Sequence, residues 1–537
     1  MPAFSAASPT AASPSSPESK PEHAQNQTEV FAVFGADPEV LAYAMAKYSR
    51  SSLSMKESLR EISSQRAEQF LNTFYFQYGH RSIADLAHVA MAVERLSLLA
   101  AIVLVDEQRW DGQERSTRYQ NFSKSGWYLP DFGSAADVRE KFTAAVEALF
   151  AEYHHTAQAM FEALKAKIAR PAEMKQESYD RTLKARAFDV SRYLLPLATN
   201  TSLGQIVSAR TLETQVSRLL TSHHAEIRNL GEKLREAAGG AAWNVQGDAL
   251  AMLQRDIAAV DPELGARAAD LLTREVRTAP TLVKYAAAND YRAATERDLR
   301  QTADSLFKGE AIYAAPVVDL IEPLAGVGGS LEVELAATLL YGACHYPYRQ
   351  IRDHVSALPA AQREEIVDLG LCHRGRHDEL LREFSAGQSL CFDILMDIGG
   401  FRDMHRHRKC TQIMQRFTSA HGYEIPEGME EAGLRSQYDS AMRAAHKAYD
   451  ELVIVGDLEA EATAQYVLPL GTRNRSLFKM DFAEALYIAE LRSTPQGHFS
   501  YRRIAWLMYQ AVAARHPSLA KYFRVSDIND PIDLLRR

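Results

Sequence analysis

Apolar residues recur at intervals of three and four positions along most of this 537-residue chain. That spacing places them on one face of a helix, so it predicts amphipathic helices. The clearest examples are residues 37–48 (DPEVLAYAMAKY), 138–164 (VREKFTAAVEALFAEYHHTAQAMFEAL) and 482–492 (FAEALYIAELR). Short runs at 29–35 (EVFAVFG) and 126–131 (GWYLPD) predict strands. The pattern therefore indicates a helix-rich α+β protein.

Four phrases of the first half return in the second half in the same order, which indicates a tandem duplication. The pairs are YAMAKY (43–48) with YGACHY (341–346), GHRSIAD (79–85) with CHRGRHD (372–378), SRYLLPLATN (191–200) with AQYVLPLGTRN (464–474), and PTLVKY (280–285) with PSLAKY (517–522). We predict two related domains at 28–290 and 310–537, each helix-rich with a small antiparallel sheet. The first carries an extra segment near 240–278. Residues 1–27, rich in Pro and Ser, predict a disordered tail.

Composition narrows the class of protein. The formal net charge of -8 argues against binding to nucleic acid or to an anionic membrane, because both need a surplus of Lys and Arg. No run of roughly 18 to 20 apolar residues predicts a membrane span. Four cysteines in the whole chain suggest a reducing compartment. We therefore expect a cytoplasmic protein with local, not global, sites for anions.

One such site is indicated by the run His405 to Lys409 (HRHRK), which follows an apolar segment with a Gly pair. Arginine presents a planar fork of donors that grips phosphate or carboxylate, and histidine can exchange a proton near neutrality. The run is suited to the wall of a pocket for an anionic, redox-active ligand. A solvated charged turn at a helix end is the other interpretation.

A second cluster lies in the first half, where Glu114, Ser116 and Arg118 occupy alternate positions. On an extended backbone alternate side chains point the same way, so an acceptor, a hydroxyl and a cation could face one ligand. A surface loop would show the same residue types.

A metal site is a weaker hypothesis. The residues with suitable ligand atoms are Cys344, His345, Cys372, His373 and His377. Their spacing differs from the usual zinc motifs, so we expect no metal. The chain also lacks a Walker A motif, a G-x-G-x-x-G turn and a G-x-S-x-G elbow.

Taken in order, these phrases resemble the flavin-dependent thymidylate synthases in both halves. The family signature is R-H-R-x-x-S-x-N-x-x-S-x-R-Y, preceded by G-H-x-S-x-x-E-H and followed by an L-P-L segment and an arginine-bearing helix. The first half matches at Gly79, His80, Ser82, Glu114, Ser116, Arg118, Tyr119 and Arg210, and conservatively at Asp85, which stands for the Glu. The second half matches at Arg406, His407, Arg408 and Arg492, with Thr411 in place of the first Ser. The first half departs at Asp106, Glu107, Gln108 and Leu219, and the second half at Ile413, Arg416 and Thr418.

The two halves therefore keep complementary parts of the signature. Active sites of the family lie between subunits of a homotetramer, so a fused pair can keep one heterologous site and lose the other. The resemblance implies a composite site between the repeats and a homodimer that rebuilds the tetrameric arrangement. An acid, Asp403, stands near the usual position of a substrate-binding Gln and could repel phosphate unless it pairs with Arg402 or Arg406.

The resemblance also implies the chemistry. FAD would be the cofactor, with NADPH and methylenetetrahydrofolate as co-substrates, in the reductive methylation of dUMP or a related pyrimidine nucleotide. The implied catalytic residues are Arg492 and His80; the implied cofactor-binding residues are Ser82, Asp85, Arg210, Arg406, His407 and Arg408; the implied substrate-binding residues are Glu114, Ser116, Arg118, Arg406 and Arg492. The alternative is a flavin- or nucleotide-binding pseudoenzyme with an assembly or regulatory role.

Overall fold

The computed structural model describes most of the chain beyond its N-terminal region. The described residues are 35–47, 59, 81–122, 124–321, 330–373, 381–384, 390–454, 457–520 and 523–535. The predicted tail, the predicted strand up to residue 34, His80 and His377 lie outside these ranges, as does the side chain of Ser82. The part from Asp37 to Arg537 forms one compact unit.

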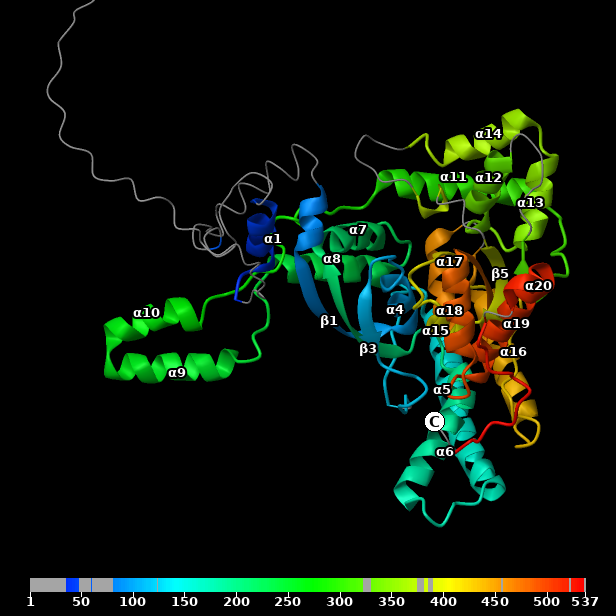
Figure 1. Ribbon diagram of the computed structural model, residues 1–537, viewed down its shortest axis with the longest axis horizontal. Coiled ribbons are helices and arrows are strands. Elements are labelled where there is room, and N and C mark those ends of the chain that lie inside the picture. The colour runs from blue at the N-terminus through cyan, green and yellow to red at the C-terminus, as the bar shows by residue number, and fades with distance from the viewer. Residues whose placement is uncertain are drawn as a thin grey trace, which may run out of the picture. The chain divides into compact units, whose positions relative to one another are not determined.

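The order of helices, 3₁₀-helices (η) and strands repeats along this unit (Figure 1). The first series is α1 (Pro38–Lys47), η2 (Arg81–Leu86), β1 (His88–Ser97), α4 (Leu98–Leu104), β2 (Asp111–Glu114), α5 (Ala136–Lys167), α6 (Gln176–Ser191), η3 (Arg192–Leu194), β3 (Asn200–Ser208), α7 (Ala209–Leu220), α8 (Ala225–Gly239), α9 (Gly247–Val260) and α10 (Pro262–Leu272). The second is α11 (Asp290–Leu306), β4 (Val318–Leu320), α12 (Ser330–Tyr341), α13 (Tyr348–Ala357), α14 (Ala360–Leu369), η4 (Arg382–Phe384), β5 (Leu390–Asp397), α15 (Ile398–Met404), β6 (Thr411–Met414), α16 (Arg435–Leu452), α17 (Leu458–Ala464), η5 (Gln465–Val467), β7 (Arg473–Met480), α18 (Phe482–Ser493), α19 (Phe499–Arg515) and α20 (Pro517–Ala520). The run from β1 to α8 thus corresponds to the run from β5 to α19.

Each half contains one small antiparallel sheet, which confirms the predicted fold class. The strand order is β1-β3-β2 in the first and β4-β5-β7-β6 in the second. β1 pairs with β3 from His88↔Ser208 onward, with a register shift at Arg95, whose φ is 61°. β5 pairs with β7 without such a shift, from Leu390↔Met480.

The two L-P-L segments pair with each other and relate the halves by an approximate two-fold axis. Pro196 and Pro469 form an antiparallel bridge. The amide of Leu197 donates to Leu468 O (2.9 Å), and at the equivalent place the amide of Leu470 donates to Leu195 O (2.9 Å). Because a proline lacks an N–H group, the flanking residues carry this pairing.

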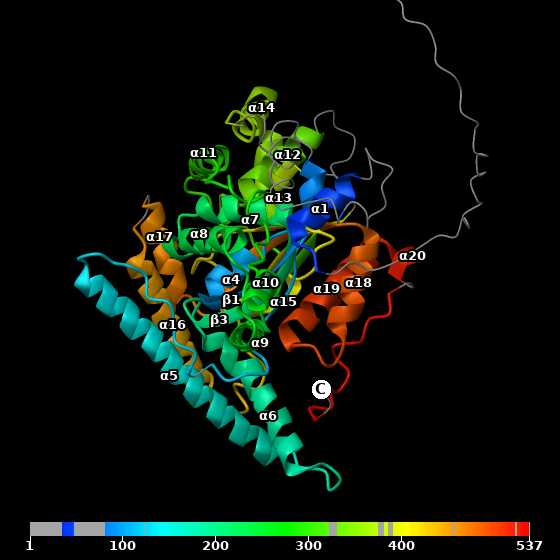
Figure 2. The same cartoon turned by 90° about the vertical axis from the view of Figure 1, so that its left-hand side faces the viewer.

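The longest helix of each half packs against that of the other. α5 buries one stripe of side chains, namely Phe142, Val146, Leu149, Tyr153, Thr156 and Met160. The stripe follows the three-and-four spacing seen in the sequence. α5 packs against α16 (Figure 2). One hydrophobic core extends across both halves. Burial of each large apolar side chain in it contributes roughly 1.5 to 3 kcal/mol to the stability of the fold.

Two regions stand apart from this shared core. α9 and α10 occupy the predicted extra segment of the first half. Helices α11 to α14 form a second, smaller core around Tyr291, Leu340 and Ile351. No helix of the described part is both long and apolar enough to cross a membrane.

One detail of the sequence prediction is wrong. Residues 126–131 do not form a strand; Trp127 makes one isolated bridge to Thr199, between Gly126 at φ 69° and Pro130, which cannot donate to a ladder. The predicted pairing of 79–85 with 372–378 falls mostly outside the described residues and stays a prediction.

Candidate active site between the two halves

The basic run lies in the turn between α15 and β6. Asp397 ends β5 and caps α15, since its Oδ1 accepts from Gly400 N (2.6 Å). The helix ends after seven residues at Met404, and cations are favoured beside the carbonyl groups at a helix end. The sequence run is therefore a charged turn at a helix end, but His405 and His407 within it are buried.

The arginines of this turn face the first half. Arg402, on α15, forms an ion pair with Glu114, and both side chains are about nine-tenths buried. Arg406 is exposed and donates to Gln113 Oε1 (3.3 Å). Arg408 donates to Glu107 O (2.8 Å) and stacks over the ring of Trp110 at 4.7 Å. The two parts of the signature thus meet within one chain.

Arg118, from the other part of the signature, reaches the second half. It is buried, and it donates to Asp189 (2.8 Å), to Tyr501 Oη (2.7 Å) and to Gln496 O (3.2 Å). Burial alone would lower the pKa of Arg118, but Asp189 raises it above the ordinary value. The guanidinium is therefore a fixed charge at the boundary of the halves.

Arg492 also reaches Tyr501, since its guanidinium lies 5.3 Å from the centroid of that ring. It donates to His407 Nε2 (2.8 Å) and to Asp403 O (2.7 Å). Because Nε2 accepts, the His407 proton is on Nδ1, which faces Glu484 at 3.4 Å. Burial, reinforced by Arg492, lowers the pKa of His407, so the ring is neutral at pH 7.

Asp403 lies at the centre of these cations. Arg192 Nη1 contacts its carboxylate at 3.4 Å. Burial would raise the pKa of Asp403, but four arginines outweigh burial and hold it below the ordinary value. These four are Arg192, Arg118, Arg406 and Arg492. We call them the arginine cluster; two come from each half.

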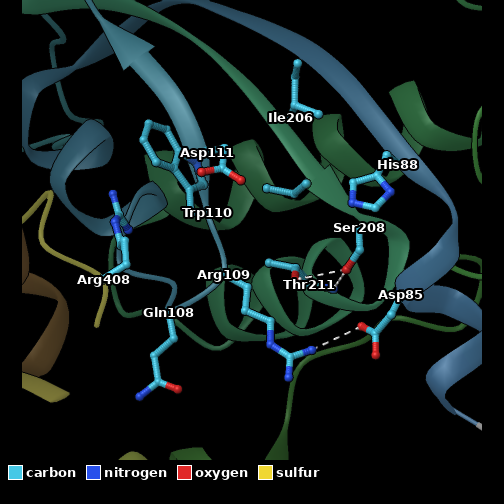
Figure 3. A pocket seen from close by; sticks show the side chains of 11 residues that line it. Asp85, His88, Gln108, Arg109, Trp110, Asp111, Ile206, Ser208, Thr211 and Arg408 are labelled. Atoms are coloured by element: carbon cyan, nitrogen blue, oxygen red, sulfur yellow. Dashed lines mark hydrogen bonds and ion pairs between the residues drawn. The ribbon is translucent and has the colours of Figure 1, made fainter. Parts of the chain in front are cut away.

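A cavity of about 350 Å³ opens between Arg408 and the sheet of the first half (Figure 3). Its lining residues are Asp85, His88, Gln108, Arg109, Trp110, Asp111, Ile206, Val207, Ser208, Thr211 and Arg408. In Figure 3, Arg408 lies near Trp110 and Asp111, with Asp85 and His88 across the cavity. Arg109 and Arg210 both pair with Asp85, at 3.4 and 3.2 Å.

The cavity fits the anionic part of a dinucleotide cofactor. Nε and Nη2 of Arg408 are buried, and neither has a hydrogen-bond partner in the part of the chain that the structure describes. These two nitrogens form one edge of the guanidinium fork, which suits bidentate contact with a phosphate. The residues present therefore fit FAD at its pyrophosphate.

The structure brings most of the predicted site residues into two adjoining groups. Glu114, Ser116, Arg118, Arg406, His407 and Arg492 lie at or next to the arginine cluster, and Asp85, Arg210 and Arg408 lie at the cavity. The sequence reasoning missed Arg192, Asp189 and Tyr501. The sequence contained a signal for Arg192, which is a lone cation ahead of the apolar L-L-P-L segment. It contained no signal that Asp189 or Tyr501 belongs to the site.

Comparison with known proteins identifies the family. The sequence profile described as "Thymidylate synthase complementing protein" matches residues 32–242 and 334–518, more than half of the chain. A UPF0159 protein of Chlamydia pneumoniae is 28% identical, covering 95% of this chain and 93% of that protein. A UPF0159 protein of Thermoplasma acidophilum is 24% identical, covering 90% and 95%.

Shorter relatives match over about one repeat. The flavin-dependent thymidylate synthase of Clostridium tetani is 26% identical over 203 residues, covering 37% of this chain and 76% of that protein. The Helicobacter pylori enzyme of this kind, solved with FAD and dUMP, aligns at 15% identity and a TM-score of 0.26, covering 37% of this chain and 89% of that one. The profile matches in two segments and the element order repeats, so the chain belongs to the thymidylate synthase complementing protein family, with a flavin-dependent thymidylate synthase-like domain in each half.

Proposed function

We propose that this protein methylates dUMP reductively, with FAD as cofactor, methylenetetrahydrofolate as carbon donor and NADPH as reductant. The observation that carries the proposal is the meeting of Arg118 from the first half with Arg406 and Arg492 from the second, around Asp403 and Tyr501. Family membership supplies the reaction class. One composite site per chain follows.

The charges of the arginine cluster suit a phosphate monoester. The four guanidinium groups carry four positive charges, and the carboxylates of Asp403 and Asp189 carry two negative charges. The net charge of this group is therefore two positive charges. A phosphate monoester near neutral pH carries up to two negative charges. Arg406, which is exposed, provides the first contact, and Arg118 provides a fixed buried charge behind it.

Arg492 is the residue that would act on the pyrimidine ring. His407 and the carbonyl of Asp403 hold its guanidinium from two sides, so it is oriented before substrate binds. A preorganised cation stabilises the negative charge that develops on the ring during methylation. His407, neutral and held by Glu484, positions this arginine.

Bound FAD supplies the redox chemistry, and the protein supplies contacts and shape. Arg408 would hold its pyrophosphate, and Asp85 with its partner Arg210 would line the same cavity. His80 and Ser82 remain predicted contacts to the cofactor and co-substrates.

The test begins with an absorbance spectrum of the purified chain after incubation with FAD. We expect a bound flavin spectrum, and, after anaerobic reduction, oxidation of the flavin that requires both dUMP and methylenetetrahydrofolate. Formation of dTMP, measured by mass spectrometry, completes the assay. A chain that stays colourless, or a reduced flavin whose oxidation ignores dUMP, would contradict the proposal.

One observation favours the alternative of a nucleotide-binding pseudoenzyme. Arg402 already forms an ion pair with Glu114, and the carboxylate of Asp403 already lies at the centre of the arginine cluster. In such a protein dUMP and FAD would bind without turnover. Binding of both ligands with no dTMP formed would support this alternative.

We also propose a cytoplasmic homodimer, in which two tandem chains rebuild four family domains. Sedimentation of an active monomer would contradict the dimer.

A further inference from the structure

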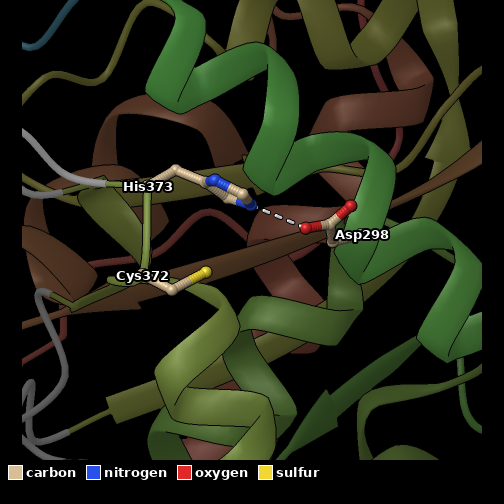
Figure 4. Close-up of side chains that lie close together, drawn as sticks. All are labelled: Asp298, Cys372 and His373. Atoms are coloured by element: carbon tan, nitrogen blue, oxygen red, sulfur yellow. Dashed lines mark hydrogen bonds and ion pairs between the residues drawn. The ribbon is translucent and has the colours of Figure 1, made fainter.

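Three side chains with metal-binding atoms meet outside the candidate active site, at the smaller core of the second half (Figure 4). Asp298 lies on α11, and Cys372 and His373 lie in the turn that follows α14. In Figure 4 the sulfur of Cys372 and the ring of His373 both point from this turn toward α11. The sequence hypothesis contained the Cys372–His373 pair but lacked the acid, which is 75 positions away from His373.

The distances are compatible with one shared ion. His373 Nε2 and Asp298 Oδ2 are 2.7 Å apart, and one ligand atom from each residue lies within 4.8 Å of the others. Zinc bond lengths of about 2.0 to 2.3 Å place neighbouring ligand atoms of a tetrahedral site roughly 3.3 to 3.8 Å apart. The measured 2.7 Å separation is shorter than this range, and all three ligand atoms lie within 4.8 Å of one another, so small side-chain rotations would bring them to zinc-ligand distances.

The surroundings leave the ligand atoms accessible. Arg297 approaches the other carboxylate oxygen of Asp298, Oδ1, at 3.6 Å, and leaves Oδ2 to His373. The turn is held by its backbone, since Cys372 N donates to Asp368 O (2.7 Å). Cys372 is exposed, while Cys344 and Cys410 are buried. An exposed thiol beside an imidazole and a carboxylate is a donor set for a thiophilic divalent cation.

We propose that Asp298, Cys372 and His373 bind a zinc ion, with water at the fourth position. Binding replaces the hydrogen bond between His373 and Asp298 by two metal bonds. The proton on His373 Nε2 moves to Nδ1 by way of solvent, which frees Nε2 for the ion, and the thiol proton of Cys372 is released to solvent. The ion joins α11 to the end of α14, two elements of the smaller core.

The experiment uses the full chain without an affinity tag, stripped with a chelator, kept reduced and titrated with Co²⁺ as a spectroscopic probe. We expect one Co²⁺ per chain, with thiolate-to-metal absorption in the near ultraviolet that Zn²⁺ abolishes by displacement. Cys372→Ser should remove this absorption, and Asp298→Asn should weaken binding tenfold or more. His354→Ala is the matched control, because His354 faces Glu310 at 3.7 Å in a comparable histidine–acid pair; it should bind as the unchanged chain does.

A second measurement does not depend on whether a variant folds. In the unchanged chain, one equivalent of Zn²⁺ should slow the reaction of the exposed thiol, Cys372, with a thiol reagent by at least tenfold. The proposal would be overturned if the absorption persisted in Cys372→Ser, or if Zn²⁺ did not change the reactivity of the thiol. His373 and Asp298 would then form an ion pair without a metal. Neither readout involves flavin or dUMP, so the proposed function can fail without affecting this test.

Discussion

The composite region, which holds the arginine cluster, and the equivalent region across the approximate two-fold axis, here called its counterpart, differ mainly in their charged side chains. Asp403 is the sixth residue of α15, and the sixth residue of α4 is Val103. Arg492 is the eleventh residue of α18, and the eleventh of α7 is Leu219, which is fully buried. Backbones of the same length and order therefore hold a polar cluster on one side and apolar side chains on the other.

The acids of the counterpart region are already paired. Burial would raise the pKa of Asp106, but Arg382, His405 and Arg218 together hold it well below its usual range. Glu107 is bound by Arg218 at 2.8 Å. In the composite region four arginines surround Asp403, whereas in its counterpart Arg382 and Arg218 form ion pairs with Asp106 and Glu107. An anionic substrate would meet carboxylates there.

The scaffold of the two regions differs far less. At the start of α4, Ser97 Oγ donates to Glu226 (2.6 Å); at the start of α15, Ser500 donates to Asp397. The hydroxyl and the carboxylate have exchanged places between the capping residue and the second residue of the equivalent helices α8 and α19. After the duplication both regions kept this hydrogen bond of the scaffold. The arginine cluster, in contrast, is present in one of the two equivalent places.

The largest expected effect is on stability, from Arg118→Ala. The change breaks the buried ion pair between Arg118 and Asp189, which costs about 3 to 5 kcal/mol of unfolding free energy. Urea denaturation followed by circular dichroism measures it. Arg503→Ala is the control, because this exposed arginine faces Glu424 at 3.5 Å and should cost under about 1 kcal/mol. Equal losses in the two variants would show that the buried ion pair contributes no more to stability than the exposed one.

Arg492→Leu gives the composite region the residue of its counterpart. We expect kcat/KM for dUMP to fall by about 10²-fold or more, since a preorganised charge is lost from the reacting ring. Circular dichroism should be unchanged, because Arg492 is only partly buried. Turnover within threefold of the unchanged enzyme would remove Arg492 from the chemistry.

Arg406→Ala tests the phosphate contact. Loss of a charge-assisted hydrogen bond costs about 1.5 to 3 kcal/mol, so the Kd for dUMP should rise tenfold or more. Calorimetric titration measures it, with Lys409→Ala as the control in the same turn. Combined with Arg118→Ala, the loss should be smaller than the sum of the two, because both arginines would hold one phosphate. Strict additivity would place them at different sites.

The smallest expected effect is a pH dependence of stability from His407. Its pKa is depressed in the folded chain, so the unfolded chain takes up more protons as the pH falls below about 6.5. Its contribution to stability is therefore complete above that pH and is lost toward the folded pKa. His407→Gln should reduce the loss of stability between pH 7 and pH 5. His155→Gln, at an exposed histidine, should not; identical pH profiles for all three proteins would contradict the assignment.

The sequence predicted the duplication, the fold class and most members of the cluster because their signals are local. Three-and-four spacing identifies α5 and α18, and the phrases of the signature identify Arg118 and Arg406. The partners of these residues are not local. Tyr501 is 383 positions from Arg118. Asp403 forms its ion pair with Arg192, while Arg406 acts on it as one charge of the arginine cluster. Such contacts depend on how the halves pack, which no local pattern records.

The central claim is that each chain has one competent site, and the direct test is the stoichiometry of ligand binding. Flavin titration followed by equilibrium dialysis with dUMP should saturate at one FAD and one dUMP per chain. The counterpart region should bind neither ligand, because Asp106 and Glu107 would repel phosphate there. Saturation at two FAD or two dUMP per chain would contradict the account.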